Sequence, residues 1–308
     1  MGKRLEVFRG LVLSSVFVLS LAAFGFLSPA KAAVQKSNPP PQSQALSLAD
    51  ILERCAAYCD RLSSAALEFV CRETVEETIA PILQGHGAVV SQGGQGGGSV
   101  TFAGPPAVAG RKARSKYVYD YQLVRDKLGQ ITETRTLTVE NGRQVEEKTS
   151  PLKTQIFQYK YIVMGPIGLL GRTQQADFDY RIVKETEFKK EPVLIIQAAP
   201  RPFTFNELLY GRIWVRKKDA SILKIEWQPE SMGNYDQIED LGKKLGMKPR
   251  LSFTSEYGFE KNGIRFPSRY AIEEAYTSRV WRPLIRSTTE VDYDGYKFFT
   301  VETGVVIR

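Results

Sequence analysis

The sequence predicts a mainly β (α+β) protein built on one large, curved antiparallel sheet, or unclosed barrel, of about ten or eleven strands. Two observations predict this fold. From Tyr117 onward, apolar and polar residues alternate in one segment after another, as in strands with one buried face. Short turns such as Asn141-Gly142 join these segments, and short turns favour antiparallel neighbours over parallel ones.

The first 32 residues have the order of a cleavable signal peptide. Three basic residues within the first nine precede an apolar run from 11 to 27, and the small-residue stretch SPAKAA comes after it. This order predicts cleavage after Ala32 and a periplasmic or secreted protein, with no cysteine placed for lipid attachment. An uncleaved anchor is the alternative, but an apolar run of this length is marginal for crossing a bilayer.

The next segment, residues 33–46 (AVQKSNPPPQSQAL), is predicted to be a disordered leader before a single domain at 47–308. Cleavage removes four basic residues and one acidic residue, which lowers the formal net charge from +8 to +5. The remaining basic residues are spread over the predicted strands, so we expect no nucleic-acid partner. Transient contact with an anionic membrane surface stays open.

A helix is predicted over 47–66. Ser47 is placed as its N-cap, and Asp50 three positions later completes a variant of the capping box. Apolar residues then recur at spacings of three and four, which predicts one buried stripe packed on the sheet. The stripe consists of Leu48, Ile51, Leu52, Cys55, Cys59, Leu62 and Ala66.

The predicted strands come next in order, beginning with FVCRETVEETI at 69–79. A glycine-rich stretch at 84–110 is predicted to be a flexible insertion, because it lacks the spacing of a phosphate-binding loop. The later strand segments are KYVYDYQLVRD, ITETRTLTVE, QVEEKTS, FDYRIVKETEF, VLIIQAAP, GRIWVRKKDASILKIEWQ, LSFTSEYGFE, IRFPSRYAIEEAY, WRPLIRSTTEVDYDGY and KFFTVETGVVI.

Three cysteines lie near the start of the predicted domain. Export favours oxidation of one pair, and three cysteines leave one over. Cys55 and Cys59 are four apart on the predicted helix, where a bridge is strained, so we predict a disulfide between Cys59 and Cys71. A zinc site is the alternative, but the only histidine, His86, lies in the glycine-rich stretch.

The apolar face of so large a sheet must be covered. The helix at 47–66 and a short helical or lid-like segment within 150–176 are the only covers that the sequence suggests. If they leave part of the face free, an apolar cavity remains. If the sheet closes on itself, the same residues fill a core, and both outcomes stay open. The candidate lining consists of Tyr119, Phe157, Phe178, Ile182, Ile196, Trp214, Ile225, Trp227, Phe253, Phe266 and Phe298.

The hairpin GRIWVRKKDASILKIE at 211–226 resembles the strand pair of the outer-membrane lipoprotein-sorting (LolA/LolB-like) superfamily. The long strands ending in KFFTV are similar too, and the resemblance covers about 115–308 in the order of elements. The stretch AYCDRLSSAALEFVCRETVEE looks closer to uncharacterised secreted bacterial proteins. The resemblance implies an unclosed barrel with helices on its concave side and an apolar cavity for lipid or lipoprotein acyl chains. Paired cysteines, the glycine-rich insertion and extra length depart from the superfamily, so no functional residue is transferred.

Catalysis is not expected. With one histidine and no G-x-S-x-G elbow, the sequence lacks the groups of a nucleophilic triad. Adjacent carboxylates such as Glu76-Glu77 and Glu273-Glu274 point to opposite faces of a strand, which separates them. We therefore expect no catalytic, metal or cofactor site. The leading hypothesis is an envelope protein that binds a lipid or lipoprotein acyl chain. The alternative is a protein–protein interaction module of the envelope with a filled core.

Overall fold

The computed structural model describes residues 47–83, 107–108, 111–125, 130–157, 161–202, 209–280 and 282–299. The predicted signal peptide, the predicted leader and all but two residues of the glycine-rich stretch lie outside these ranges. None of the described helices is long and apolar enough to cross a membrane.

Three α-helices and three short 3-10 helices occur among the described residues. They are α1 (Leu48–Ala65), η1 (Ile162–Met164), α2 (Gly165–Leu170), η2 (Gln174–Asp177), η3 (Pro229–Ser231) and α3 (Tyr235–Leu245). The strands are β1 (Phe69–Ile79), β2 (Ile82–Leu83), β3 (Ala107–Val108), β4 (Ala113–Arg125), β5 (Ile131–Glu140), β6 (Arg143–Glu147), β7 (Phe178–Phe188), β8 (Glu191–Pro200), β9 (Gly211–Arg216), β10 (Ile222–Trp227), β11 (Lys248–Glu256), β12 (Phe259–Lys261), β13 (Ile264–Phe266), β14 (Arg269–Thr277) and β15 (Leu284–Phe298).

Eleven strands form one antiparallel sheet, in the order β6-β5-β4-β1-β15-β14-β11-β10-β9-β8-β7. β6 and β7 are its two edges and do not pair with each other, so the barrel is unclosed, as predicted. Most neighbouring strands are consecutive in the sequence. The exceptions are β1, which pairs with β4 on one side and with β15 on the other, and β11, which pairs with β14 across the separate β12–β13 hairpin. The fold class predicted from alternation and short turns is therefore confirmed.

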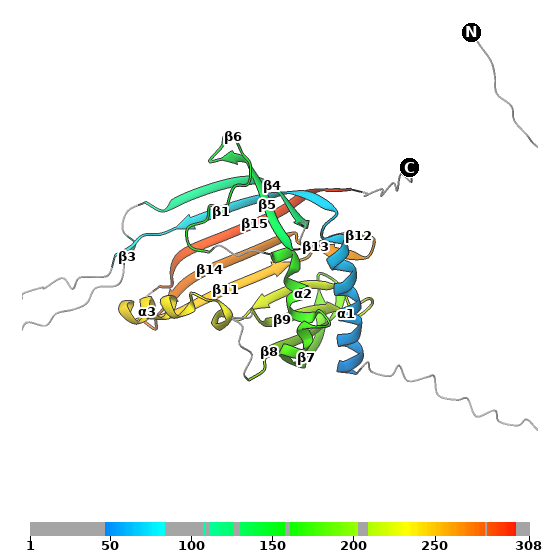
Figure 1. Cartoon of the computed structure of the whole chain (residues 1–308). Coiled ribbons are helices and arrows are strands. Elements are labelled where there is room, and N and C mark those ends of the chain that lie inside the picture. The colour runs from blue at the N-terminus through cyan, green and yellow to red at the C-terminus, as the bar shows by residue number, and fades with distance from the viewer. Residues whose placement is uncertain are drawn as a thin grey trace, which may run out of the picture. The chain divides into compact units, whose positions relative to one another are not determined.

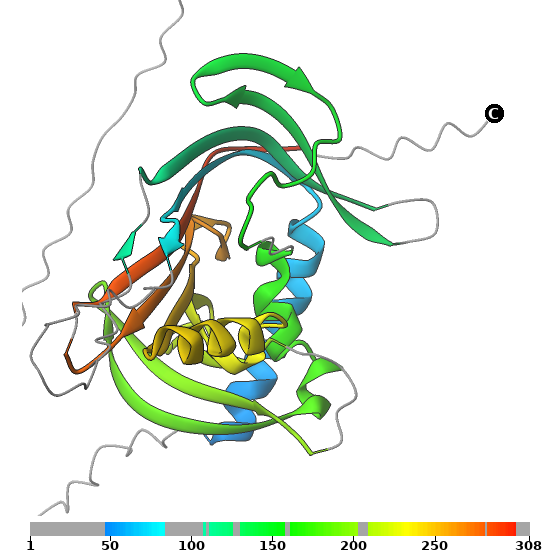
Figure 2. The same cartoon turned by 90° about the vertical axis from the view of Figure 1, so that its left-hand side faces the viewer.

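The curved sheet surrounds a single apolar interior. Figure 2 shows the sheet bending around α1, α2 and α3, and in Figure 1 α1 and α2 lie against the part of the sheet that contains β7, β8 and β9. Buried side chains from these helices and from the sheet form one contiguous core. Its burial removes a large apolar area from water and is the main contribution that favours folding.

Local sequence signals place the elements that carry this interior. The Ser47 side chain accepts a bond from the Asp50 amide and the Asp50 side chain accepts from the Ser47 amide, so the capping box is confirmed. Asn141 and Gly142 both have positive φ, which the two-residue turn between β5 and β6 requires.

Two fold details differ from the sequence predictions. α3 was not predicted, so the helix at 47–66 and the segment at 150–176 are not the only covers of the sheet. The closing segments of the chain, predicted as two strands, include one continuous strand at 284–298.

The predicted disulfide between Cys59 and Cys71 is absent, because all three cysteines are free and buried. The Cys59 thiol donates to the carbonyl of Pro166, 3.5 Å away, so it points toward α2. The Cys71 thiol instead interacts with the Tyr296 hydroxyl. The two sulfur atoms thus face different neighbours, and the disulfide prediction is corrected.

Candidate ligand-binding interior and adjoining clefts

Most of the predicted lining residues lie together in the interior. Six of the eight aromatic candidates belong to the buried core, and a seventh, Phe298, is partly buried against it. Trp227 stacks on Phe253 with ring centroids 5.7 Å apart, and Phe298 meets Phe266 edge-on at 5.2 Å. The six buried residues are Tyr119, Phe157, Phe178, Trp227, Phe253 and Phe266.

Trp214 lies elsewhere. Its neighbours Ile213 and Val215 are the core residues of β9, and alternation along the strand therefore turns Trp214 to the other face. There the ammonium of Lys224 lies 4.7 Å from the centre of its ring. Ile182 is also corrected, because it is exposed on the edge strand β7.

We call α1, η1 and α2 together the roof. Its two parts are joined to each other by polar contacts: Arg172, just after α2, forms a two-bond ion pair with Glu53 of α1 at 2.7 and 2.9 Å. Gln175 donates to the Leu52 carbonyl at 2.9 Å. The roof is therefore one unit, although its parts are about a hundred residues apart in the sequence.

The roof accepts hydrogen bonds from two tyrosines, one on β7 and one directly after β11. The Tyr257 hydroxyl donates to the Ile162 carbonyl at 3.0 Å, and the Tyr180 hydroxyl donates to the Leu169 carbonyl. At Gly165 an added Cβ would lie 2.8 Å from the Tyr257 hydroxyl and 3.1 Å from the Trp227 ring. Only glycine lets the α2 backbone approach the sheet this closely.

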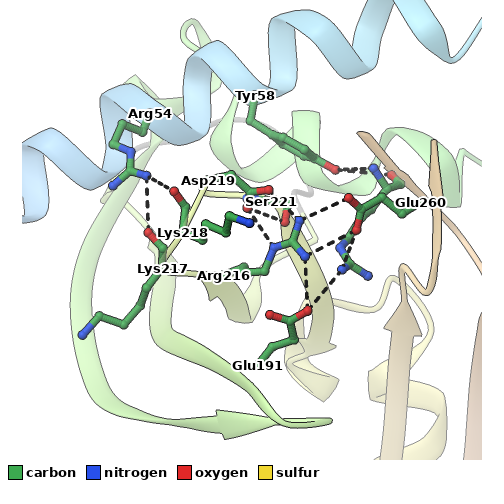
Figure 3. Close-up of polar contacts among 10 residues, drawn as sticks. Arg54, Tyr58, Glu191, Arg216, Lys217, Lys218, Asp219, Ser221 and Glu260 are labelled. Carbon is green, nitrogen blue, oxygen red and sulfur yellow. Dashed lines mark hydrogen bonds and ion pairs between the residues drawn. The ribbon is translucent and has the colours of Figure 1, made fainter. Parts of the chain in front are cut away.

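A second set of contacts, which we call the latch, ties α1 to strand β13 and to the turn between β9 and β10 (Figure 3). The Tyr58 hydroxyl accepts from the Arg265 amide at 3.0 Å and donates to the Arg265 carbonyl at 3.3 Å. Arg54 donates to the carbonyls of Lys217 and Lys218. The latch uses backbone groups of β13 and of the turn between β9 and β10, so it stabilises one position of the roof.

An ion-pair cluster supports the turn under the latch. Arg216 bonds to Asp219 at 2.5 and 2.9 Å and also contacts Glu191 and Glu260. Burial opposes the charge on Asp219, but the bonds from Arg216 and Ser221 outweigh it and lower the pKa of Asp219. The bond to Asp219 in turn raises the pKa of Arg216. The turn that receives Arg54 is therefore fixed by charge-assisted hydrogen bonds.

The cysteines are unsuited to nucleophilic work. Burial raises the pKa of Cys55 to about 12 and raises the pKa of Cys59 and of Cys71 as well. Because only the thiolate attacks or binds metal, these neutral thiols act as small apolar side chains of the interior.

Two of the clefts beside the described residues have charged side chains in their walls. The first, of about 370 Å³, lies where β5 faces Ser150 and Tyr161, with Glu133 and Arg135 in its wall. The second, of about 330 Å³, lies where α3 faces Glu274 and Arg286. None of the eight predicted aromatic residues lines either of these two clefts, and six of the eight are buried in the core.

The wall of the first cleft contains a buried charge network. Arg135 bonds to Glu73 through two nitrogens, at 2.5 and 3.0 Å, and to Glu133 at 3.0 Å. The side chains of Glu73, Glu133 and Arg135 are 0%, 5% and 6% exposed. Burial disfavours the guanidinium charge, but the two carboxylates outweigh it and raise the pKa of Arg135. Tyr293 donates to Glu73 and Tyr121 donates to Glu133, both at 2.9 Å.

Sequence reasoning missed this network, although a signal was present. Glu73 lies between Cys71 and Val75 at the apolar positions of β1, and Arg135 precedes Leu137 in the same way on β5. Charged residues at apolar positions of an alternating strand need buried partners. Such a pair of positions on separate strands therefore indicates an internal ion pair.

No family model matches the sequence, and no curated protein matches it. Among solved structures, the chain is similar to a LolA superfamily protein from Nitrosomonas europaea, with 13% identity, a TM-score of 0.34, and coverage of 86% of this chain and 99% of that one. It is also similar to a DUF1329 family protein from Desulfovibrio piger (10%, 0.37, 82% and 94%) and to an outer membrane lipoprotein-sorting protein domain from Vibrio parahaemolyticus (8%, 0.33, 82% and 94%).

Two of these three structures belong by name to the superfamily that the hairpin at 211–226 resembles. At these identities and TM-scores the likeness concerns the fold alone, and the ligand must be argued from the residues of this chain.

Proposed function

We propose that this protein is an exported, non-enzymatic binding protein that takes up an apolar chain, such as the acyl chain of a lipid or lipoprotein, between the concave face and the roof. The observation that carries the proposal is the combination of an aromatic concave face with a roof that packs on it through apolar side chains and whose polar contacts to it are mainly hydrogen bonds to backbone groups. Apolar burial supplies affinity with little directional contact.

Because six of the eight aromatic candidates are buried in the core, the roof must move for a chain to reach them. Full burial of a twelve-carbon chain contributes about 9 kcal/mol, at about 0.8 kcal/mol per methylene. The hydrogen bonds of the roof and the latch contribute about 1 kcal/mol each. A chain that replaces the roof's own apolar contacts can therefore compensate for the loss of these bonds.

Two measurements test the proposal. Protein isolated from an exporting host without detergent should carry lipid that native mass spectrometry detects. Laurate should raise the melting temperature of delipidated protein, because a ligand that binds only the folded state stabilises it. Absence of both effects would contradict the proposal.

Tyr58→Phe examines the latch. The variant keeps the ring and loses the hydroxyl bonds to the Arg265 backbone, so we expect faster laurate uptake in stopped-flow measurements. Tyr296→Phe is the matched control. Its hydroxyl donates to the Pro267 carbonyl, so this variant loses a hydrogen bond that does not involve the roof. Equal rates for both variants would show that the latch does not control entry.

A second function is favoured by a separate observation at the edge of the sheet. β7 is an eleven-residue edge strand, and Ile182 and Val183 on it are 40% and 42% exposed. An extended segment of an envelope protein could pair with this edge through backbone hydrogen bonds. Ile182→Lys with Val183→Lys should then abolish recovery of a stoichiometric partner from envelope extract, while laurate binding is unchanged.

A further inference from the structure

The cleft beside Glu133 has a charged wall that the proposed apolar site does not use. Glu133 and Arg135 line it, together with the hydroxyl-bearing residues Thr132, Thr134 and Ser150. Its volume of about 370 Å³ admits a small organic group.

The two carboxylates of the buried network are held by donors. Among the described residues, Glu73 accepts three hydrogen bonds, two from Arg135 and one from Tyr293. Glu133 also accepts three, from Arg135, the Tyr121 hydroxyl and the Tyr161 amide.

Among the residues that the structure describes, the network carries one negative charge more than it balances. Two carboxylates face one guanidinium, and a buried charge without a partner is unfavourable. Lys153, which follows the lining residue Leu152 in the sequence, is itself already paired with Glu140 and Glu147 at 3.2 and 2.8 Å. This negative region belongs to a chain whose formal net charge is +8.

We infer that this cleft binds a primary ammonium group. An ammonium supplies the missing positive charge and three donors, which suit the Glu133 carboxylate and the hydroxyl groups of the wall. An anion does not fit the same wall, because Arg135 is already engaged by two carboxylates and a third negative group would add repulsion.

The cleft also touches the start of the roof. The Tyr161 amide donates to Glu133 at 2.5 Å immediately before η1, and Tyr161 holds a left-handed φ of 59°. An ammonium at Glu133 competes for the same carboxylate. The ammonium can belong to a free amine or to the head group of an amphiphile whose chain enters the interior.

The test is titration calorimetry on the mature protein with butylamine, with butyrate as the charge-reversed probe, and with dodecylamine below its micelle threshold. We expect butylamine to bind and butyrate not to bind. If dodecylamine binds much more tightly than butylamine, the site accepts the head group of an amphiphile. If the two affinities are equal, the site accepts free amines.

Glu133→Gln removes the charge and keeps the shape, and should weaken butylamine binding about 10- to 100-fold, as expected for a charge-assisted hydrogen bond. Glu185→Gln on β7 makes the same change in net charge away from the cleft and should leave affinity unchanged. If Glu133→Gln does not fold, Thr132→Val should weaken binding about 2- to 10-fold.

The inference would be overturned if butyrate binds with the same affinity as butylamine. It would also be overturned if the Glu133 variant binds butylamine with unchanged affinity. These results would leave the proposed acyl-chain function standing, because laurate uptake is measured separately. Conversely, butylamine binding without laurate binding would support the cleft and contradict the proposed function.

Discussion

Replacing Arg135 with methionine tests whether the ion network contributes to stability as a buried network or only as an ordinary surface ion pair. Met has a similar length and no charge, so the variant leaves Glu73 and Glu133 buried without their guanidinium. Tyr293 and Tyr121 still donate to them, but two buried negative charges then lack their cationic partner.

Removing one partner of a buried, hydrogen-bonded ion pair costs about 3–5 kcal/mol, because the remaining charge stays buried. With a urea m-value of about 2–3 kcal/mol/M, the unfolding midpoint should fall by about 1–2 M. Arg72→Met is the matched control on β1. Its pair with Asp294 is 2.6 Å long, but the two side chains are 58% and 50% exposed, so the loss should stay below about 1 kcal/mol.

The assay is equilibrium urea unfolding followed by circular dichroism, with both variants measured beside the parent protein. If Arg135→Met and Arg72→Met shift the midpoint equally, the network is not buried as described. A parent-like Arg135→Met protein would likewise refute the argument for an excess negative charge beside the cleft.

Three further predictions concern the glycines of α2, the ion pair of Asp219 and the cysteines. Gly165→Ala should cost about 1–3 kcal/mol because its Cβ meets the Tyr257 hydroxyl at 2.8 Å, whereas Gly168→Ala, with open space around it, should stabilise α2 by up to about 1 kcal/mol in thermal unfolding. Asp219→Asn should cost about 1 kcal/mol at pH 7. Because bonding to Arg216 lowers the folded-state pKa of Asp219, that contribution is present above its ordinary pKa and fades as pH falls below it, so parent and variant should converge in acid. Iodoacetamide should label no cysteine in the folded protein and all three cysteines after denaturation without reductant. Labelling of only one cysteine in the denatured protein would contradict the free-thiol assignment.

Much of the fold could be predicted because alternation and turn chemistry are local signals. β1, β5 and β7 have the boundaries that alternation predicts. Asn141 and Gly142 form the predicted turn between β5 and β6, and both have positive φ. α3 was harder, since Ile238, Leu241 and Leu245 give it only a short stripe within a polar segment.

The candidate site could be predicted only in part. Six of the eight aromatic residues predicted to face inward are buried in the core, but Ile213, Trp214 and Val215 are all apolar, so alternation alone does not say which of them faces inward. The disulfide failed for a related reason: the direction in which Cys59 points depends on how α1 meets α2, which no local pattern contains. The Glu73–Arg135 pair joins residues 62 positions apart and needs the order of the strands.

Fluorescence quenching by a brominated acyl chain tests the proposed binding site most directly. Variants that retain one tryptophan each would report from Trp227, under the roof, and from Trp214, on the opposite face of the sheet. The proposed site predicts strong quenching of Trp227 and none of Trp214. Quenching of neither residue, or of both equally, would contradict an apolar chain held between the roof and the concave face.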